Sequence, residues 1–127
     1  MSEYALVITD DDEAIRFDAE SMRDQIVVRW PGTEVFPGPA FDGDTAVFHA
    51  NVATEPSVIT IYLDQEGQMI GIEPSAVDET TEFVPWALTF LSTPGTHVTL
   101  YGADFSTELE VTPATSADDI RAFLAAS

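Results

Sequence analysis

The sequence predicts an α+β domain in which an antiparallel sheet of about five to six strands, a meander plus a hairpin, carries two to three helices on one face. Several short segments alternate apolar and polar residues, which is typical of strands with one buried face. Other segments repeat apolar residues every three or four positions, which is typical of amphipathic helices. The 127 residues suit a single domain over 1–127, and 45% of them are hydrophobic, which is enough for one core.

In the N-terminal part, one strand and one helix are expected. The strand is Tyr4–Thr9, a β-branched apolar run that ends at three aspartates. The helix begins near Asp18, because apolar residues then recur at helical spacing as far as Pro31-Gly32. Residues 14–17 fit either the first turn of this helix or the return strand of a hairpin. The Pro- and Gly-rich stretch from Pro31 to Gly43 predicts an ordered loop or an edge segment rather than a regular element.

The middle of the chain predicts an antiparallel meander followed by a second helix. The strands of the meander are Thr45–Val52, Ser57–Leu63 and Met69–Glu73, and the clearest hairpin tip is Asp64–Gln68. The first turn of the helix is expected to contain Pro85, because a proline there removes no intrahelical donor. The regular helix would then start near Glu82. The candidate caps are Ser75, Thr80 and Thr81.

The C-terminal part predicts a hairpin and a last helix. The hairpin strands are His97–Tyr101 and Ser106–Thr112, on either side of a turn at Gly102–Asp104. Ser116 is expected to cap the helix, because a serine side chain accepts a hydrogen bond from the backbone of the first turn. Both elements would complete the sheet and the helical layer.

The charge of the chain is its most informative property for function. The formal net charge is -19, and between Trp30 and Ile120 there are fifteen carboxylates and no Lys or Arg. A surplus of this size usually serves solubility, salt tolerance or a basic partner. Nucleic acids and anionic membranes are poor partners, because the chain offers four Arg and no Lys against 23 carboxylates.

Several classes of chemistry are disfavoured by the residues that the chain contains. The absence of Cys removes disulfides and thiolate sites, and the absence of Lys removes Schiff-base chemistry. Asp10–Glu13 lacks the alternating ligands of an EF-hand loop, so no metal site is expected. His49 and His97 each stand alone, so we expect no catalytic residue and no cofactor. No apolar run approaches the length of a membrane span and no secretory signal begins the chain, so we expect a cytoplasmic protein.

The candidate binding residues follow from the expected strand directions. Successive loops of a meander alternate between the two ends of a sheet, so carboxylates of alternate loops should converge at one end. These are Asp42, Asp44, Asp64 and Glu66, with Asp78, Glu79 and Asp104 at the other end. Alternation also places a second candidate set on the sheet face away from the helices: Tyr62, Tyr101, Glu108 and Glu110.

Three explanations of the acidic charge are open at this point. Salt adaptation would spread carboxylates over the surface, although this chain keeps abundant large apolar residues and a mean hydropathy of +0.06. A small ligand-binding or enzymatic domain would use the open sheet face around His49, Tyr62, His97 and Tyr101. A dedicated protein partner with a basic site is the third, because complementary charge speeds association and suppresses wrong partners.

The layout of the chain adds to the third explanation. The chain is small, acidic and free of Cys, and its first helix ends in Ile26-Val-Val-Arg-Trp-Pro-Gly32. A β-meander follows, and the late hairpin contains Val98-Thr-Leu-Tyr-Gly102. In this layout the chain resembles the immunity proteins of bacterial polymorphic toxin systems. The resemblance implies a non-enzymatic inhibitor that binds a cognate toxin domain and covers its active site or substrate groove.

Overall fold

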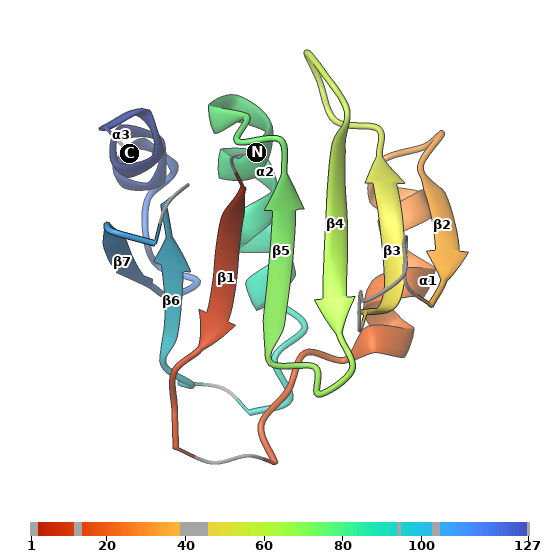
Figure 1. Cartoon of the computed structure of the whole chain (residues 1–127), viewed down its shortest axis with the longest axis horizontal. Helices are drawn as coiled ribbons and strands as arrows, with labels where there is room; N and C mark the ends of the chain where they lie inside the picture. The colour runs from red at the N-terminus through yellow and green to blue at the C-terminus, as the bar shows by residue number, and fades with distance from the viewer. Residues whose placement is uncertain (1–2, 12–13, 39–45, 94, 103–104, 127) are drawn as a thin grey trace.

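The computed structural model describes residues 3–11, 14–38, 46–93, 95–102 and 105–126. Within these residues it contains one sheet of seven strands and three helices (Figure 1). The strands are β1 (Tyr4–Ile8), β2 (Glu34–Pro37), β3 (Ala46–Val52), β4 (Ile59–Asp64), β5 (Met69–Glu73), β6 (Val98–Tyr101) and β7 (Glu108–Val111). The helices are α1 (Ala19–Arg29), α2 (Val77–Leu88) and α3 (Ala117–Ala126).

All neighbouring strands are antiparallel, in the order β2-β3-β4-β5-β1-β6-β7. The N-terminal strand β1 lies between β5 and β6, so it joins the meander to the C-terminal hairpin. The predicted α+β class, the meander and the hairpin are confirmed. The sheet has seven strands, slightly more than the five to six expected.

The additional strand is β2, within the stretch that was expected to be a loop or an edge segment. It pairs with β3 over Glu34–Pro37 at one edge of the sheet. A proline is tolerated there because an edge strand pairs on one side only. The prediction of no regular element is therefore wrong for these residues, since pairing with β3 outweighs the local effect of Pro and Gly.

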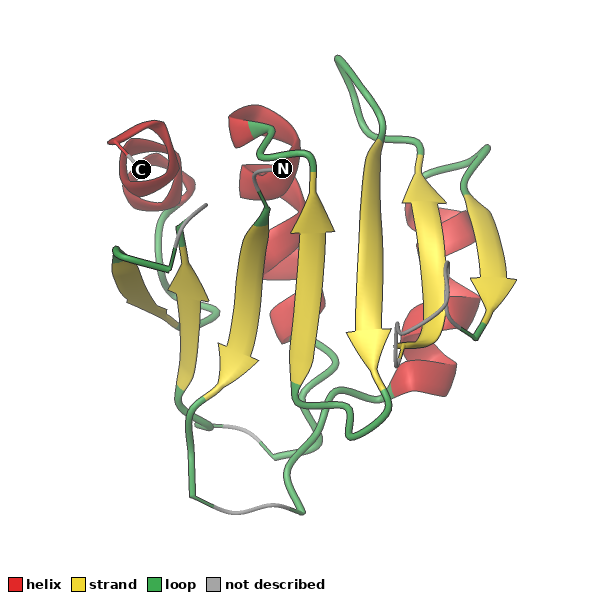
Figure 2. Ribbon diagram, viewed as in Figure 1, coloured by secondary structure: helices red, strands yellow, loops and turns green. Residues whose placement is uncertain are grey.

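The helices cover one face of the sheet and leave the other uncovered (Figures 1 and 2). Strand residues that face the helices are buried, among them Phe48, Ile61, Ile72 and Leu100, each no more than 1% exposed. They alternate with more exposed neighbours, which confirms the predicted assignment of faces. Burial of each such side chain contributes about 1.5–3 kcal/mol. The strand register is therefore strongly specified, because a shift by one residue would turn these side chains to solvent.

The first helix and the segment before it connect the two layers. Asp18 is the N-cap of α1, and its Oδ1 accepts a hydrogen bond from the backbone N–H of Ser21 at 3.1 Å. This confirms the predicted helix start. Residues 14–17 form neither a helical turn nor a hairpin strand; Phe17 is 1% exposed and pairs with Leu91 in an isolated bridge. The residue before the N-cap of α1 thus pairs with the segment that follows α2.

The start of α2 corrects the sequence prediction. The helix begins at Val77 rather than near Glu82, and Pro85 lies in its interior. A proline there has no N–H to donate to the carbonyl of Thr81, which disfavours a helix in isolation. Packing compensates, because the side of α2 that faces the sheet is buried from its first turn to Leu88. Local propensity alone therefore misplaced the beginning of this helix.

The caps of the two later helices differ. Ala76 is the N-cap of α2 and provides no side-chain hydrogen bond, so the candidate caps Ser75, Thr80 and Thr81 do not serve that role. In α3, the backbone N–H of Asp119 donates to Oγ of Ser116 at 3.1 Å, which confirms the predicted cap. The hydroxyl of Tyr4, on the side of β1 that faces the helices, lies 3.4 Å from the carbonyl oxygen of Leu124 in α3. This contact docks α3 against the centre of the sheet.

Candidate functional site

The sheet face opposite the helices is called the open face. Its residues alternate with the buried ones along β3, β4 and β5, and the strand pairing places them in rows across the sheet. The central row crosses all seven strands and consists of Phe36, His49, Tyr62, Gly71, Ala5, Tyr101 and Glu108. Three of the eight predicted binding residues, Tyr62, Tyr101 and Glu108, belong to this central row.

Stacked rings occupy one end of the central row. The ring centroids of Phe36 and His49 are 5.0 Å apart with an interplanar angle of 18°. Those of His49 and Tyr62 are 6.2 Å apart with an angle of 21°. The Nδ1 atom of His49 lies 2.9 Å from the carbonyl oxygen of Gly38, which orients the imidazole. The histidine is therefore part of an aromatic stack, held by a backbone contact at the edge of the sheet.

Cations and carboxylates are distributed differently over the two layers. None of the four Arg belongs to a strand: Arg23 and Arg29 lie on α1, Arg121 on α3, and Arg16 in the segment before α1. The strands carry five carboxylates, and the alternation along each strand places all five on the open face: Glu34, Asp64, Glu73, Glu108 and Glu110. The open face is thus acidic, and no strand carries an Arg or a Lys.

Two of the arginines pair with carboxylates inside the helical layer. Arg29 Nη2 lies 2.6 Å from Glu82 Oε1, and its guanidinium carbon lies 4.6 Å from the ring centroid of Trp30. Arg121 Nε lies 3.1 Å from Asp78 Oδ1, and its Nη1 lies 3.6 Å from Asp118 Oδ1. These contacts link α1 to α2 and α2 to α3. They compensate charge on the helical side of the molecule only.

Two carboxyl groups adjoin one another above the centre of the open face. Burial, together with the charge of Glu73 and a hydrogen bond to it, raises the pKa of Glu3 above its usual value. Oε2 of Glu73 also accepts a hydrogen bond from the hydroxyl of Tyr62 at 3.2 Å. Neighbouring carboxylates favour retention of a proton, because two like charges at short distance repel. The group Glu3, Glu73 and Tyr62 is therefore coupled.

The other side of the open face combines an exposed aromatic ring with two glutamates. Phe105 is 52% exposed, and its ring centroid lies 5.4 Å from that of Tyr101. Glu108 and Glu110 are exposed on β7. Nδ1 of His97 lies 3.2 Å from Oε1 of Glu110, and both side chains are largely exposed. Exposed aromatic rings beside charged groups are typical of protein-binding surfaces.

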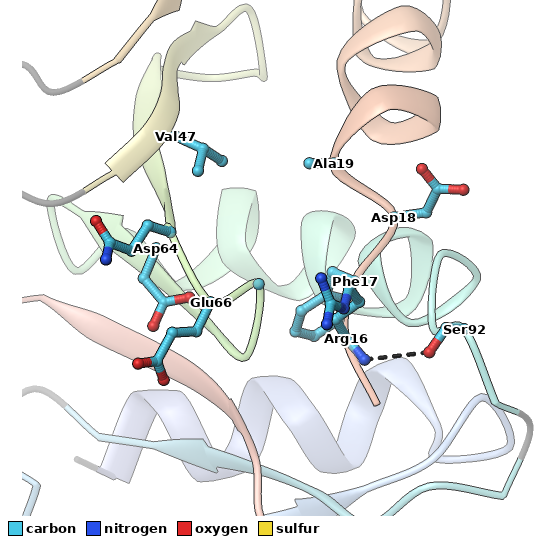
Figure 3. A pocket seen from close by; sticks show the side chains of 10 residues that line it. Arg16, Phe17, Asp18, Ala19, Val47, Asp64, Glu66 and Ser92 are labelled. Carbon is cyan, nitrogen blue, oxygen red and sulfur yellow. Dashed lines mark hydrogen bonds between the residues drawn. The ribbon is translucent and has the colours of Figure 1, made fainter. Parts of the chain in front are cut away.

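Two further predicted binding residues, Asp64 and Glu66, belong to the end of the sheet where β4 finishes. Asp64 and Glu66 line a cavity of about 280 Å³ together with Arg16 and Phe17 (Figure 3). Oδ1 of Asp64 accepts hydrogen bonds from two backbone N–H groups, that of Gln68 at 3.0 Å and that of Met69 at 3.4 Å. Asp64 therefore stabilises the β4–β5 turn, while Glu66 is exposed.

Only two of the four loop carboxylates that were predicted to converge lie within the described residues. Asp42 and Asp44 lie outside the described residues, as does Asp104, so their convergence with Asp64 and Glu66 stays a prediction. Asp78 and Glu79 lie at the start of α2, which follows the opposite end of β5. Glu79 is 5% exposed and accepts a hydrogen bond from the hydroxyl of Ser57, so it is part of the packing.

Several residues of the open face were missed as site residues by sequence reasoning, among them Glu3, Phe36 and Gly71. The alternation of β1 would have turned Glu3 outward with Ala5, but its proximity to Glu73 depends on β1 lying beside β5. Phe36 was missed because its segment was expected to be a loop. Gly71 has no side chain, so its importance emerges only from its neighbours across the sheet.

Other kinds of site find no support in the part of the chain that the structure describes. No cluster of three or more His, Asp or Glu among these residues is arranged to hold a metal ion. None of the described helices has the length and hydropathy of a membrane span. The cavity of about 280 Å³ and a second one of about 310 Å³, beside His97 and Val111, lie at one end of the sheet, away from the central row.

No protein-family model, curated protein or solved structure matches this chain. An α+β architecture hosts many unrelated functions, so the fold alone does not indicate one. The features that bear on function are the separation of charge between the two layers and the row of aromatic and acidic side chains on the open face.

Proposed function

We propose that this chain is a non-enzymatic binding protein whose open face docks on a basic protein surface. More specifically, we propose that the chain is an immunity protein, which binds and neutralises a cognate toxin domain with a basic active site or groove. The observation that carries the proposal is the absence of Lys and Arg from all seven strands, beside five outward carboxylates. An acidic face without internal compensation is complementary to a cationic surface.

The aromatic side chains of the open face support binding of a protein rather than simple hydration of the surface. Phe36, at one end of the central row, is 38% exposed, and Phe105, beside Tyr101 of that row, is 52% exposed. Exposed rings beside polar groups act as anchors in protein interfaces because they bury a large area at little entropic cost. A surface adapted only to salt needs no such rings.

The test of the general proposal is the rate of association with the captured partner. The open-face variant replaces Glu73, Glu108 and Glu110 by Gln, and the control replaces the exposed helical residues Glu20, Asp24 and Asp119 by Gln or Asn. Both variants lose three charges. We expect the open-face variant to slow association about tenfold at low salt and the control to change it far less, because charges close to the interface steer encounter.

The partner itself is sought first by capture from the source organism, then by co-expression with the toxin domain of the neighbouring reading frame. We expect co-expression to restore growth in the presence of that toxin. Equal association rates for the two variants would show that the open face is not the binding surface. If no basic protein from the source organism binds the purified chain, the general proposal is wrong.

A further inference from the structure

In the central row, the stacked rings are followed by a glycine, which has no side chain. Phe36, His49 and Tyr62 follow one another on β2, β3 and β4, with centroid spacings of 5.0 Å and 6.2 Å. The next residue in the row is Gly71 on β5, which is partly exposed. Glycine is unfavourable in a strand and often marks close approach of another group.

The surroundings of Gly71 define what such a group would touch. A Cβ atom placed on Gly71 would lie 3.6 Å from Oε2 of Glu3 and 3.7 Å from Cδ2 of Tyr62. Both distances are ordinary van der Waals contacts, so there is room for a group of that size. The next residue in the row, Ala5 on β1, is 2% exposed, so neighbouring side chains already cover it. A group over Gly71 therefore meets an aromatic ring and a carboxylate at once.

The charge of this position favours a cation. Glu73 lies two residues along β5 from Gly71, on the same face, and is linked to Glu3 and to the hydroxyl of Tyr62. Burial raises the pKa of Glu3, and the charge of Glu73 raises it further, so a state with both carboxyl groups ionised is disfavoured. A cation between them would remove that repulsion.

We propose that the basic partner inserts one arginine side chain over Gly71, with its guanidinium against the ring of Tyr62 and donating to the carboxylates of Glu73 and Glu3. This inference rests on the proposed function, because it names the residue of the partner that the open face receives. The guanidinium would stand as the next planar group after Phe36, His49 and Tyr62.

Arginine fits this position better than lysine for geometric reasons. Its planar guanidinium stacks on aromatic rings and donates to two carboxylates at once, whereas an ammonium is a compact and strongly hydrated charge. The acceptors on this chain suit a guanidinium, because the carboxyl groups of Glu73 and Glu3 both lie near the ring of Tyr62. A lysine would satisfy the charge but not the stacking.

The first test uses the protein alone, so it does not depend on finding the partner. N-acetyl-arginine amide and N-acetyl-lysine amide are titrated into the ¹⁵N-labelled chain, and amide shifts are followed by NMR. We expect the arginine compound to shift the amides of Gly71, Tyr62 and Glu73 most, and the lysine compound to bind at least threefold more weakly. Equal binding of both compounds, or shifts spread evenly over all carboxylates, would overturn the proposed arginine site.

The second test uses variants with the captured partner. Gly71→Val fills the position, and valine suits a strand, so the fold is expected to persist. Glu73→Gln removes one acceptor, and Glu20→Gln is the matched control, with the same change of charge at an exposed residue of α1 outside the open face. We expect Gly71→Val and Glu73→Gln to weaken binding about tenfold or more, as for other central interface residues, and the control less than about threefold.

The two proposals fail in different ways. If the partner binds wild type and Gly71→Val with equal affinity, the arginine site is wrong while the acidic open face remains the docking surface. If no basic partner binds but the arginine compound still shifts Gly71, the arginine site stands without the proposed immunity function. Unfolding of Gly71→Val would leave Glu73→Gln and Glu20→Gln to decide, because neither removes buried apolar surface.

Discussion

The two faces of the sheet use similar residue types in opposite ways. On the helical side, aromatic rings pack together, as Trp30, Phe83 and Trp86 do with centroid distances of 5.0–6.0 Å. On the open face, Phe36 and Phe105 leave more than a third of their surface in solvent. Arginines likewise occur on the helical side and on no strand. The contrast teaches that one side is arranged for stability, whereas the other keeps charge and rings exposed.

The largest expected difference between the faces is in stability. Phe83→Ala removes a fully buried ring, which costs about 3–5 kcal/mol in the free energy of unfolding. Phe105→Ala makes the same change at an exposed ring and should cost well under about 1 kcal/mol. Urea denaturation of both variants measures the difference. Similar losses would break the comparison, because they would mean that the ring of Phe105 is part of the core.

A smaller difference is expected from charge. Replacing Glu34, Glu73 and Glu108 by Gln removes repulsion on the open face and should raise the free energy of unfolding by about 1 kcal/mol at low salt. Replacing Asp78, Glu82 and Asp118 by neutral amides removes partners of Arg and should not raise it. The two effects are measured by thermal unfolding at low and at molar salt. An equal gain in both variants would contradict the separation of charge.

The end of the sheet offers a third contrast, between Asp64 and Glu66 on one turn. Asp64→Ala removes the acceptor for two backbone N–H groups and should cost about 1 kcal/mol of stability. Glu66→Ala removes an exposed carboxylate and should change stability by less than about 0.5 kcal/mol. Chemical denaturation measures both. If Asp64→Ala leaves stability unchanged but slows association with the partner, Asp64 is a docking residue rather than a turn residue.

The smallest effect concerns Glu3 and depends on pH. Because the folded state raises the pKa of Glu3, its ionised form costs stability above that pKa, and the cost disappears as pH falls below the value in the unfolded chain. Glu3→Gln should therefore raise the free energy of unfolding at pH 7, by no more than about 0.5 kcal/mol because the group is partly exposed. The gain should vanish below about pH 4. A gain that is independent of pH would contradict the raised pKa of Glu3.

The candidate site was predictable to the extent that it depends on alternation along single strands. Alternation predicted Tyr62, Tyr101 and Glu108 on one face of the sheet, whereas their position in one row follows from the strand order and register. Glu73 was expected on the same face, but its coupling to Glu3 was not. That coupling needs β1 beside β5, a pairing of residues that are almost seventy positions apart in the chain, such as Tyr4 and Ile72.

The sequence by itself determined the α+β class, the inward and outward residues of β3, β4, β5, β6 and β7, and the excess of carboxylates over cations, because these depend on local periodicity and composition. Only the tertiary structure decided that β1 lies at the centre of the sheet, that β2 pairs at its edge, and that α2 continues through Pro85. The reason is that strand order and helix packing depend on the free energy of burying a shared core, to which distant segments contribute together. The row that places Gly71 between Tyr62 and Ala5 is a product of that packing.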